Sequence, residues 1–158
     1  MTGYVGIEIA VKPYIKAYLH KELGDTLKLA PGAHVIYNQL LSLLERNTNP
    51  DKADAECNYG AFIKVYISVS KMRRYGCNLN STNIRQFNKF VELLLKHRFH
   101  RMMDDLITMN PGFERNLRVV RRQLGIDEDD WSTDSMKKDY YRSRVKRNMP
   151  LLRRKDVD

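Results

Sequence analysis

The sequence predicts an α+β fold, in which a short antiparallel sheet packs on a long central helix and a helix-turn-helix-like pair of helices follows. Residues 4–10 and 62–69 alternate apolar and polar side chains, as half-buried strands do. Residues 84–107 repeat apolar side chains at helical spacing, over a length that suits a central helix. Two shorter helical patterns joined by a turn fill residues 111–148.

These patterns divide the chain into a scaffold and a basic appendage. A chain of 158 residues is long enough to bury a core of its own. We expect an α+β scaffold domain over residues 1–110, a basic helix-turn-helix-like segment over residues 111–150 and a tail over residues 151–158.

The amino-terminal elements are expected to be a strand, a helix and a second, shorter strand. After the strand at residues 4–10, Pro13 suits the first turn of a helix, because a proline has no N–H to leave unpaired there. Gly24 fits the left-handed position that often ends a helix. The stretch "TLKLA", residues 26–30, has the pattern of a short strand.

The middle of the chain is expected to hold a helix, an exposed loop and the clearest strand. An apolar stripe that includes Ile36 and Leu40 predicts a helix beginning near Pro31. Polar, turn-forming residues over 46–60 predict the loop, and "FIKVYISV", residues 62–69, predicts the strand.

The long helix and the two helices after it can also be bounded from the sequence. A turn at "RRYGCNLN" precedes the long helix, which we expect to be capped by Ser81 or Thr82 and to run to Met109. Of the two following helices, the first is expected to be capped by Asn110 and ended by a left-handed Gly125. The second is expected to be capped by one of the two hydroxyl residues after Trp131, Ser132 or Thr133, and to run to about residue 148.

Positive charge is concentrated near the carboxyl end. The formal net charge is +9, and residues 115–155 alone carry a net +7. The same segment contains Trp131, Met136 and Tyr140, which are expected to anchor the last helix to the body of the protein. The pattern therefore indicates a folded element with a cationic outer face rather than a solvated tail.

The last helix is the strongest candidate for a functional surface. Proteins gain DNA affinity from cations on phosphates and gain specificity from side chains that reach base edges in the major groove. The side chains expected to enter the groove are Lys137, Tyr141, Arg142 and Arg144. Those expected to contact phosphates are Arg118, Arg121, Arg122, Lys138 and Arg147, with Arg115 and Lys146 on the same helices.

An acidic run lies between the two basic helices. Carboxylates at residues 127–130 repel phosphate, although they also stabilise a helix N-terminus that follows them. Either these carboxylates point away from the DNA, or the DNA contacts come from the middle and carboxyl-terminal half of the last helix. The connection is also longer than the compact turn of a helix-turn-helix.

The sequence predicts a non-catalytic DNA-binding protein whose partner is double-stranded DNA. A homodimer would suit a palindromic site, but no self-pairing stripe establishes one. RNA offers the same charge with a different geometry and stays open as a partner; Phe62 and Tyr66, on one strand, are a faint sign of the stacking residues that RNA modules carry. The alternative function is that of a structural or assembly protein, in which the basic helix binds an acidic protein.

Catalysis and metal binding have weak support. His97, His100 and Asp104 recur at helical spacing and would have to carry any metal-dependent or acid–base chemistry. The sequence contains no Gly-rich phosphate loop and no nucleophile motif. Cys57 and Cys77 lack the spacing of a zinc site and are expected to be reduced. We therefore expect no enzyme activity, no metal and no cofactor.

The location is expected to be cytoplasmic, with no membrane partner. No apolar run approaches the ~20 residues that a membrane span requires. The first residues lack the basic region of a signal peptide.

Three stretches of the chain resemble a group of small basic proteins from phages and mobile elements of gut anaerobes. They are "VKPYIKAYLHKELG", "TNIRQFNKFVELLLKHRFHRMMDDLI" and "LGIDEDDWSTDSMKKDYYRSR", and residues 125–144 are the sharpest part. The resemblance implies a carboxyl-terminal helix-turn-helix and a role as a DNA-binding regulator or replication accessory in a bacterial host cell. It implies no role for any single residue.

Overall fold

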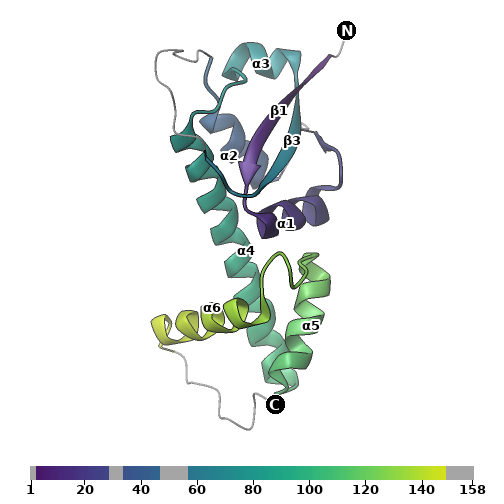
Figure 1. Cartoon of the computed structure of the whole chain (residues 1–158), viewed down its shortest axis with the longest axis vertical. Helices are drawn as coiled ribbons and strands as arrows, with labels where there is room; N and C mark the ends of the chain where they lie inside the picture. Colours follow the sequence, from purple (N-terminus) through teal and green to yellow (C-terminus); the bar gives the residue numbers. More distant parts are fainter. Residues whose placement is uncertain (1–2, 29–33, 47–56, 149–158) are drawn as a thin grey trace. The chain divides into compact units, whose positions relative to one another are not determined.

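The computed structural model describes residues 3–28, 34–46 and 57–148 of the chain. Within these ranges the elements are β1 (Tyr4–Val11), α1 (Pro13–Leu23), β2 (Leu27–Lys28), α2 (Val35–Leu43), β3 (Ala61–Ser68), α3 (Val69–Tyr75), α4 (Ser81–Met109), α5 (Phe113–Leu124) and α6 (Thr133–Lys146) (Figure 1). The predicted α+β class is confirmed, with a small sheet and mostly helical structure.

Two compact units make up the chain, and they divide between Glu92 and Leu93, inside α4. The sequence placed the division near residue 110 instead. The reason for the difference is that the second half of α4 supplies buried side chains to the core of the carboxyl-terminal unit, Leu95, Phe99 and Met103 among them. The expected tail at residues 151–158 lies outside the described residues.

The amino-terminal unit is built on a three-stranded sheet in the order β1-β3-β2. β1 pairs antiparallel with β3, from Tyr4 opposite Ser68 to Val11 opposite Ala61. β2 pairs parallel with β3, so the prediction of an antiparallel sheet is confirmed for β1 and wrong for β2. α1 connects β1 to β2, which lies on the opposite edge of β3, and a strand of two residues gives no sequence signal for its direction.

The core of this unit lies on one face of the sheet. Alternate side chains of β1 and β3 are buried there, as their period of two requires. Figure 1 shows α2 and the first part of α4 on that side of the strands. The buried side chains include Ile7, Ile9, Ile63, Val65 and Ile67 of the strands, Leu40 of α2, and Phe87 and Val91 of α4.

A buried amide joins β1 to α4. Asn88 is 2 % exposed, and its Nδ2 donates to the carbonyl of Ala10 at 2.9 Å while its Oδ1 accepts from the backbone N–H of Lys12 at 3.2 Å. Glu92, one turn along, accepts from Lys12 Nζ at 2.7 Å and from the Tyr14 hydroxyl at 2.9 Å. These bonds fix the end of β1 and the start of α1 against the helix.

The helix boundaries agree with the sequence in part. α4 ends at Met109 as predicted, but the cap expected from Ser81 or Thr82 is wrong, because the capping side chain is Asn80, whose Oδ1 accepts from the N–H of Asn83 at 2.8 Å. α2 begins at Val35, and Pro31 and most of the predicted loop lie outside the described residues. α3 was not predicted, because none of its residues is buried and its sequence has no apolar stripe.

The turn after α3 depends on a glycine, which supports a stability prediction. Gly76 has a φ of +93°, and a Cβ there would lie 2.0 Å from the carbonyl oxygen of Glu45. We expect Gly76→Ala to lower the free energy of unfolding by about 2 kcal/mol more than Gly24→Ala does. Gly24 is the matched control, because its φ is +80° but a Cβ there meets nothing within 4 Å. Urea unfolding of the two variants measures the difference, and equal losses would contradict the steric explanation.

Candidate nucleic-acid interface

The carboxyl-terminal unit is a three-helix core formed by the second part of α4, α5 and α6. Aromatic rings fill its centre, and Phe99, Phe113 and Tyr140 are fully buried. Trp131 and Met136 are also buried, which confirms the three anchor residues predicted for the last helix. The cationic side chains of α5 and α6 therefore stand on a packed unit.

The ends of α5 and α6 follow the sequence in part. Gly125 ends α5 in the left-handed region, with φ +69°, and the buried Ile126 folds back so that its N–H donates to Arg121 O at 3.2 Å. Ser132 caps α6 by accepting from the N–H of Ser135 at 3.3 Å, as predicted. The cap expected from Asn110 is wrong, because α5 begins at Phe113 after Gly112 and has no side-chain cap.

Arg144 does not fit the groove contact that the sequence assigned to it. The residue is only 6 % exposed. Its Nη1 donates to the Tyr140 hydroxyl at 2.9 Å and forms an ion pair with Asp104 Oδ1 at 3.3 Å. The guanidinium thus holds α6 on α4 and is not offered to solvent.

Asp104 is the centre of this polar tie between α4 and α6. Its Oδ1 accepts from the Tyr140 hydroxyl at 2.6 Å, and its Oδ2 accepts from Arg147 Nη1 at 2.6 Å. Burial, followed by the hydrogen bond to Asp104, raises the pKa of Tyr140 to about 12. Tyr140 is therefore a neutral donor at physiological pH. Arg147, which was expected on a phosphate, is paired with Asp104, which it shares with Arg144.

A second tie between the same helices runs through Asp139. Its Oδ2 lies 2.7 Å from His100 Nε2, and its Oδ1 lies 3.0 Å from Lys96 Nζ. Burial alone would raise the pKa of Asp139, but the hydrogen bonds from His100 and Lys96 outweigh burial and hold this pKa below its usual value.

The pKa of Asp139 gives a pH-dependent prediction. A carboxyl whose folded pKa is depressed adds stability above its unfolded pKa of about 4, and this stability is lost as the pH falls through the folded value. We expect Asp139→Asn to cost about 2 kcal/mol at pH 6, and the gap between variant and wild type to shrink towards pH 3. Asp129→Asn, at an exposed position, is the control for charge alone. A gap that is the same at both pH values in urea unfolding would contradict the role of this ion pair.

The candidates for metal or acid–base chemistry, His97, His100 and Asp104, line one open groove of the carboxyl-terminal unit. His100 and Asp104 take part in the two separate ties, and His97 is exposed. Among the described residues, no group of three His, Cys, Asp or Glu side chains is placed to hold a metal ion.

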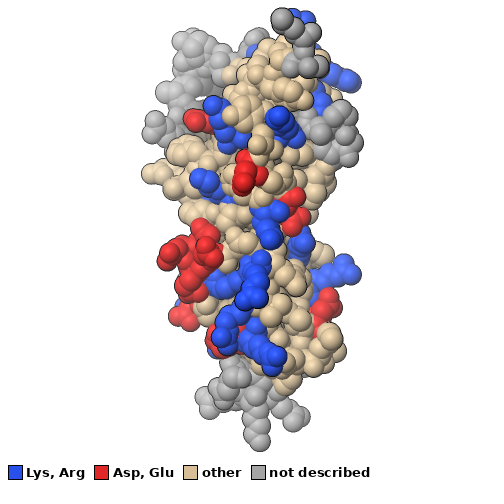
Figure 2. All heavy atoms as spheres, turned by 90° about the vertical axis from the view of Figure 1, so that its right-hand side faces the viewer, with Lys and Arg blue, Asp and Glu red and all other residues tan. Residues whose placement is uncertain are grey.

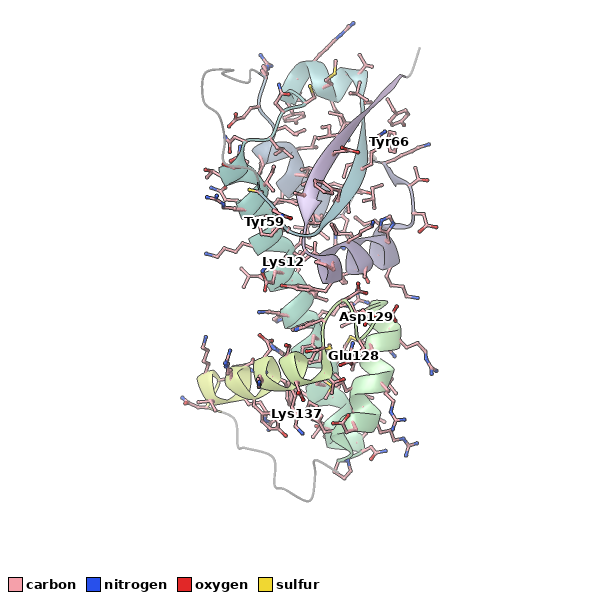
Figure 3. The ribbon with its side chains drawn as sticks, viewed as in Figure 1. Lys12, Tyr59, Tyr66, Glu128, Asp129 and Lys137 are labelled. Atoms are coloured by element: carbon pink, nitrogen blue, oxygen red, sulfur yellow. The ribbon has the colours of Figure 1, made fainter. Side chains whose placement is uncertain are left out.

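Arg121 ties the acidic connection to α5 instead of facing solvent. Its side chain is 12 % exposed, and its Nη2 lies 2.7 Å from Glu128 Oε2, 2.7 Å from Trp131 O and 3.2 Å from Thr133 Oγ1. Glu128 also accepts from the hydroxyl of Thr133 at 2.6 Å and from its N–H at 2.8 Å. These side-chain and backbone hydrogen bonds from Thr133 lower the pKa of Glu128. One carboxylate of the acidic run therefore stabilises the start of α6 (Figure 3).

Six cations of α5 and α6 remain exposed without an ion pair to any described residue. Three of them lie on α5 at intervals of three and four residues, and so share one side of that helix, which we call the α5 face. The other three lie on α6 at intervals of four residues, and we call their side of the helix the α6 face. The α5 face is Arg115, Arg118 and Arg122, and the α6 face is Lys138, Arg142 and Lys146. Figure 2 shows basic side chains gathered over α5, with acidic side chains to one side of them.

Lys137 and Tyr141 are neither fully exposed nor buried, because they pack on an aromatic ring. The ring of Tyr141 stacks on Phe113 with centroids 5.8 Å apart. Nζ of Lys137, a residue labelled in Figure 3, lies 5.6 Å from the centroid of the Phe113 ring. Both residues are partly exposed. They pack α6 against α5 and still reach the surface.

The structure thus sorts the nine residues expected at the interface. Arg118, Arg122, Lys138 and Arg142 are exposed, while Arg121, Arg144 and Arg147 are engaged with carboxylates. Arg115 and Lys146, to which the sequence gave second place, complete the exposed set. Their signal in the sequence was spacing: each continues a helical row of cations.

Comparisons with protein-family models, curated proteins and solved structures find no match. Within the described residues, no helix has the length and apolar character needed to cross a membrane. Function is therefore inferred from the packing and charge of the units themselves.

Proposed function

We propose that the carboxyl-terminal unit binds double-stranded DNA without catalysis, through the α5 face and the α6 face. The observation that supports this proposal is which charges of the unit are paired and which are exposed. Asp104, Asp139 and Glu128 are engaged inside the unit, while the six cations of the two faces are exposed and make no ion pair with a described residue. Exposed cations of this kind bind phosphates by releasing counterions.

The helices hold these cations at fixed spacing. Successive members of the α6 face are four residues apart, which places them about 6 Å apart along the helix axis. The core beneath them is closed by Trp131, Met136 and Tyr140, so that the row does not depend on a mobile tail. A row of fixed cations suits a regular polyanion such as the backbone of a duplex.

The exposed carboxylates limit where the DNA lies. Asp129 is exposed in the connection, and Asp134 is exposed in the first turn of α6, one turn before Lys138. Both repel phosphate. We therefore place the contact on the part of α6 that begins at Lys137, and assign base-edge contact to Lys137, Tyr141 and Arg142.

The resemblance to small basic proteins of phages and mobile elements favours a regulator or a replication accessory as the biological role. In either role the unit would position the protein on a duplex. A partner with an acidic protein surface would use the same two faces, and the experiment below separates the two ligands.

Fluorescence anisotropy with a labelled duplex tests the proposal. Five phosphate contacts, from the exposed cations other than Arg142, predict that affinity falls about 500-fold between about 50 mM and 200 mM salt, because each contact contributes about 0.9 to the slope of log K against log salt. Absence of binding at the lower salt, or binding that does not respond to salt, would reject the proposal. A protein partner recovered from cells in the absence of any DNA affinity would favour the acidic-surface alternative.

A further inference from the structure

The amino-terminal unit carries aromatic side chains on the face of its sheet that points away from the core. Phe62 is 59 % exposed and Tyr4 is 50 % exposed, and Tyr66 is partly exposed. Figure 3 shows Tyr66 pointing away from the sheet on the side opposite α2 and α4. Large exposed aromatic side chains gathered on one face indicate a binding surface rather than core packing.

Lysines are interleaved with these rings. Along β3, Phe62, Lys64 and Tyr66 occupy consecutive outward positions, about 6.6 Å apart. Lys28 of β2 is paired in register with Tyr66. Lys64 Nζ lies 5.8 Å from the centroid of the Tyr66 ring, and Lys28 Nζ lies 5.4 Å from that of Tyr4. Ring and ammonium thus alternate along and across the strands.

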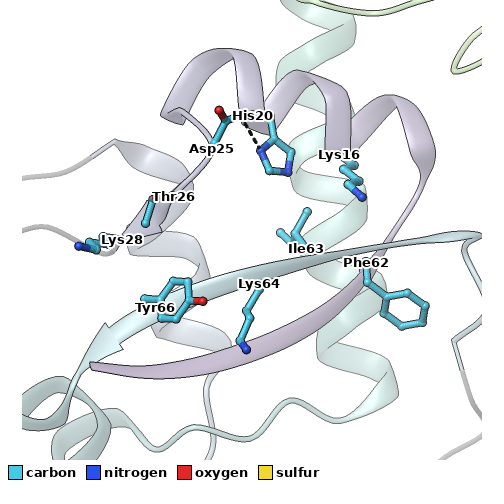
Figure 4. Close-up of a pocket in the computed structure, with 9 residues that line it drawn as sticks. All are labelled: Lys16, His20, Asp25, Thr26, Lys28, Phe62, Ile63, Lys64 and Tyr66. Carbon is cyan, nitrogen blue, oxygen red and sulfur yellow. Dashed lines mark ion pairs between the residues drawn. The ribbon is translucent and has the colours of Figure 1, made fainter. Parts of the chain in front are cut away.

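A groove of about 450 Å³ opens along this surface (Figure 4). Lys16 of α1 joins Lys28 and Lys64 along it, and none of the three makes an ion pair with a described residue. Two carboxylates lie nearby: Asp25, 3.6 Å from His20, and Glu8, opposite Lys64 in the sheet register. The groove therefore keeps an excess of cations beside exposed rings.

We propose that this groove binds single-stranded nucleic acid. Bases would stack on Phe62 and Tyr66, and the phosphates between them would meet Lys16, Lys28 and Lys64. Proteins that hold single strands combine these two features, because every base has a stacking face and every nucleotide carries a charge. A sheet with outward aromatic residues is one established way to present them.

The chemistry of the groove selects against a duplex. Bases inside a duplex are stacked on one another and have no face for Phe62 or Tyr66. The α6 face, in contrast, carries cations without an exposed aromatic row and does not discriminate between strands in this way. The inference does not depend on duplex binding by the carboxyl-terminal unit.

Anisotropy of the full-length chain with labelled oligothymidylate and oligouridylate tests the groove. The background is the variant Lys138→Ala, Arg142→Ala, Lys146→Ala, which removes the α6 face. In this background we expect binding of at least one oligonucleotide to persist, to weaken about tenfold in Phe62→Ala, and to be retained in Phe62→Tyr. The sugar preferred is read from the two probes.

Two results would overturn the inference. One is that neither oligonucleotide binds in the α6-face background, and the other is that Phe62→Ala binds as tightly as its parent. Phe62 is suitable for this purpose because its exposure means that truncation leaves the core intact, and thermal unfolding followed by circular dichroism verifies this. Duplex binding, measured on Phe62→Ala alone, should equal that of the wild type, so that failure of one site is distinguishable from failure of the other.

Discussion

Replacing Lys138, Arg142 and Lys146 by alanine together is expected to weaken duplex binding on the order of 100-fold at about 0.1 M salt. At that concentration each phosphate contact contributes up to a factor of about eight, and not every cation of the face need meet a phosphate. The slope of log K against log salt should become shallower by about two to three. Both quantities come from anisotropy titrations at several salt concentrations.

The control removes the same number of charges from the other unit. Arg73, Arg85 and Lys89 are exposed in the amino-terminal unit, and their replacement by alanine gives a chain of equal net charge. This variant should bind the duplex almost as the wild type does. If the two triple variants lose the same affinity, then binding follows net charge and the α6 face is not a site.

The largest loss of stability is expected from Asp104→Asn, about 3 kcal/mol. The substitution leaves the Arg144 guanidinium buried without its carboxylate, and an uncompensated buried charge is costly. It also weakens the acceptor of the Tyr140 hydroxyl. Urea unfolding, monitored by the fluorescence of Trp131, which lies in the same unit, measures the change.

Asp105→Asn is the matched control, because the adjacent carboxylate is exposed and should tolerate the change within about 0.5 kcal/mol. A double-mutant cycle identifies the cause. In an Arg144→Met background the buried cation is gone, so Asp104→Asn should cost much less. An unchanged cost in that background would show that the loss does not come from the ion pair.

Hydrophobic periodicity was sufficient to predict most of the fold. β1, β3, α4 and the two terminal helices were recognisable because each buries one regular face. α3 was not predicted because it buries none of its residues. The direction of β2 was wrong because a strand of two residues carries no information about which edge of the sheet it joins or in which direction it runs. The division at Leu93 was also out of reach, since a continuous helical pattern does not show which core each turn serves.

The interface was less predictable because charge in a sequence does not reveal its partner. Arg118 and Arg121 look alike in the printed chain, yet Arg121 meets Glu128 across a turn. Arg144 meets Asp104, which lies on another helix far away in sequence. The spacing in the sequence could identify the rows of cations, whereas only the structure shows which of these cations are paired with carboxylates of the same chain.

The continuity of α4 across the boundary at Leu93 affects how this protein can be cleaved by proteases and how its gene can be divided. A protease needs an extended stretch of chain, and between the units it meets a hydrogen-bonded helix instead. If the two units were expressed as separate fragments divided at this point, each fragment would have a new helix terminus with four unpaired backbone groups. We therefore expect the two units to be inherited, expressed and degraded together as one protein rather than exchanged as separate domains.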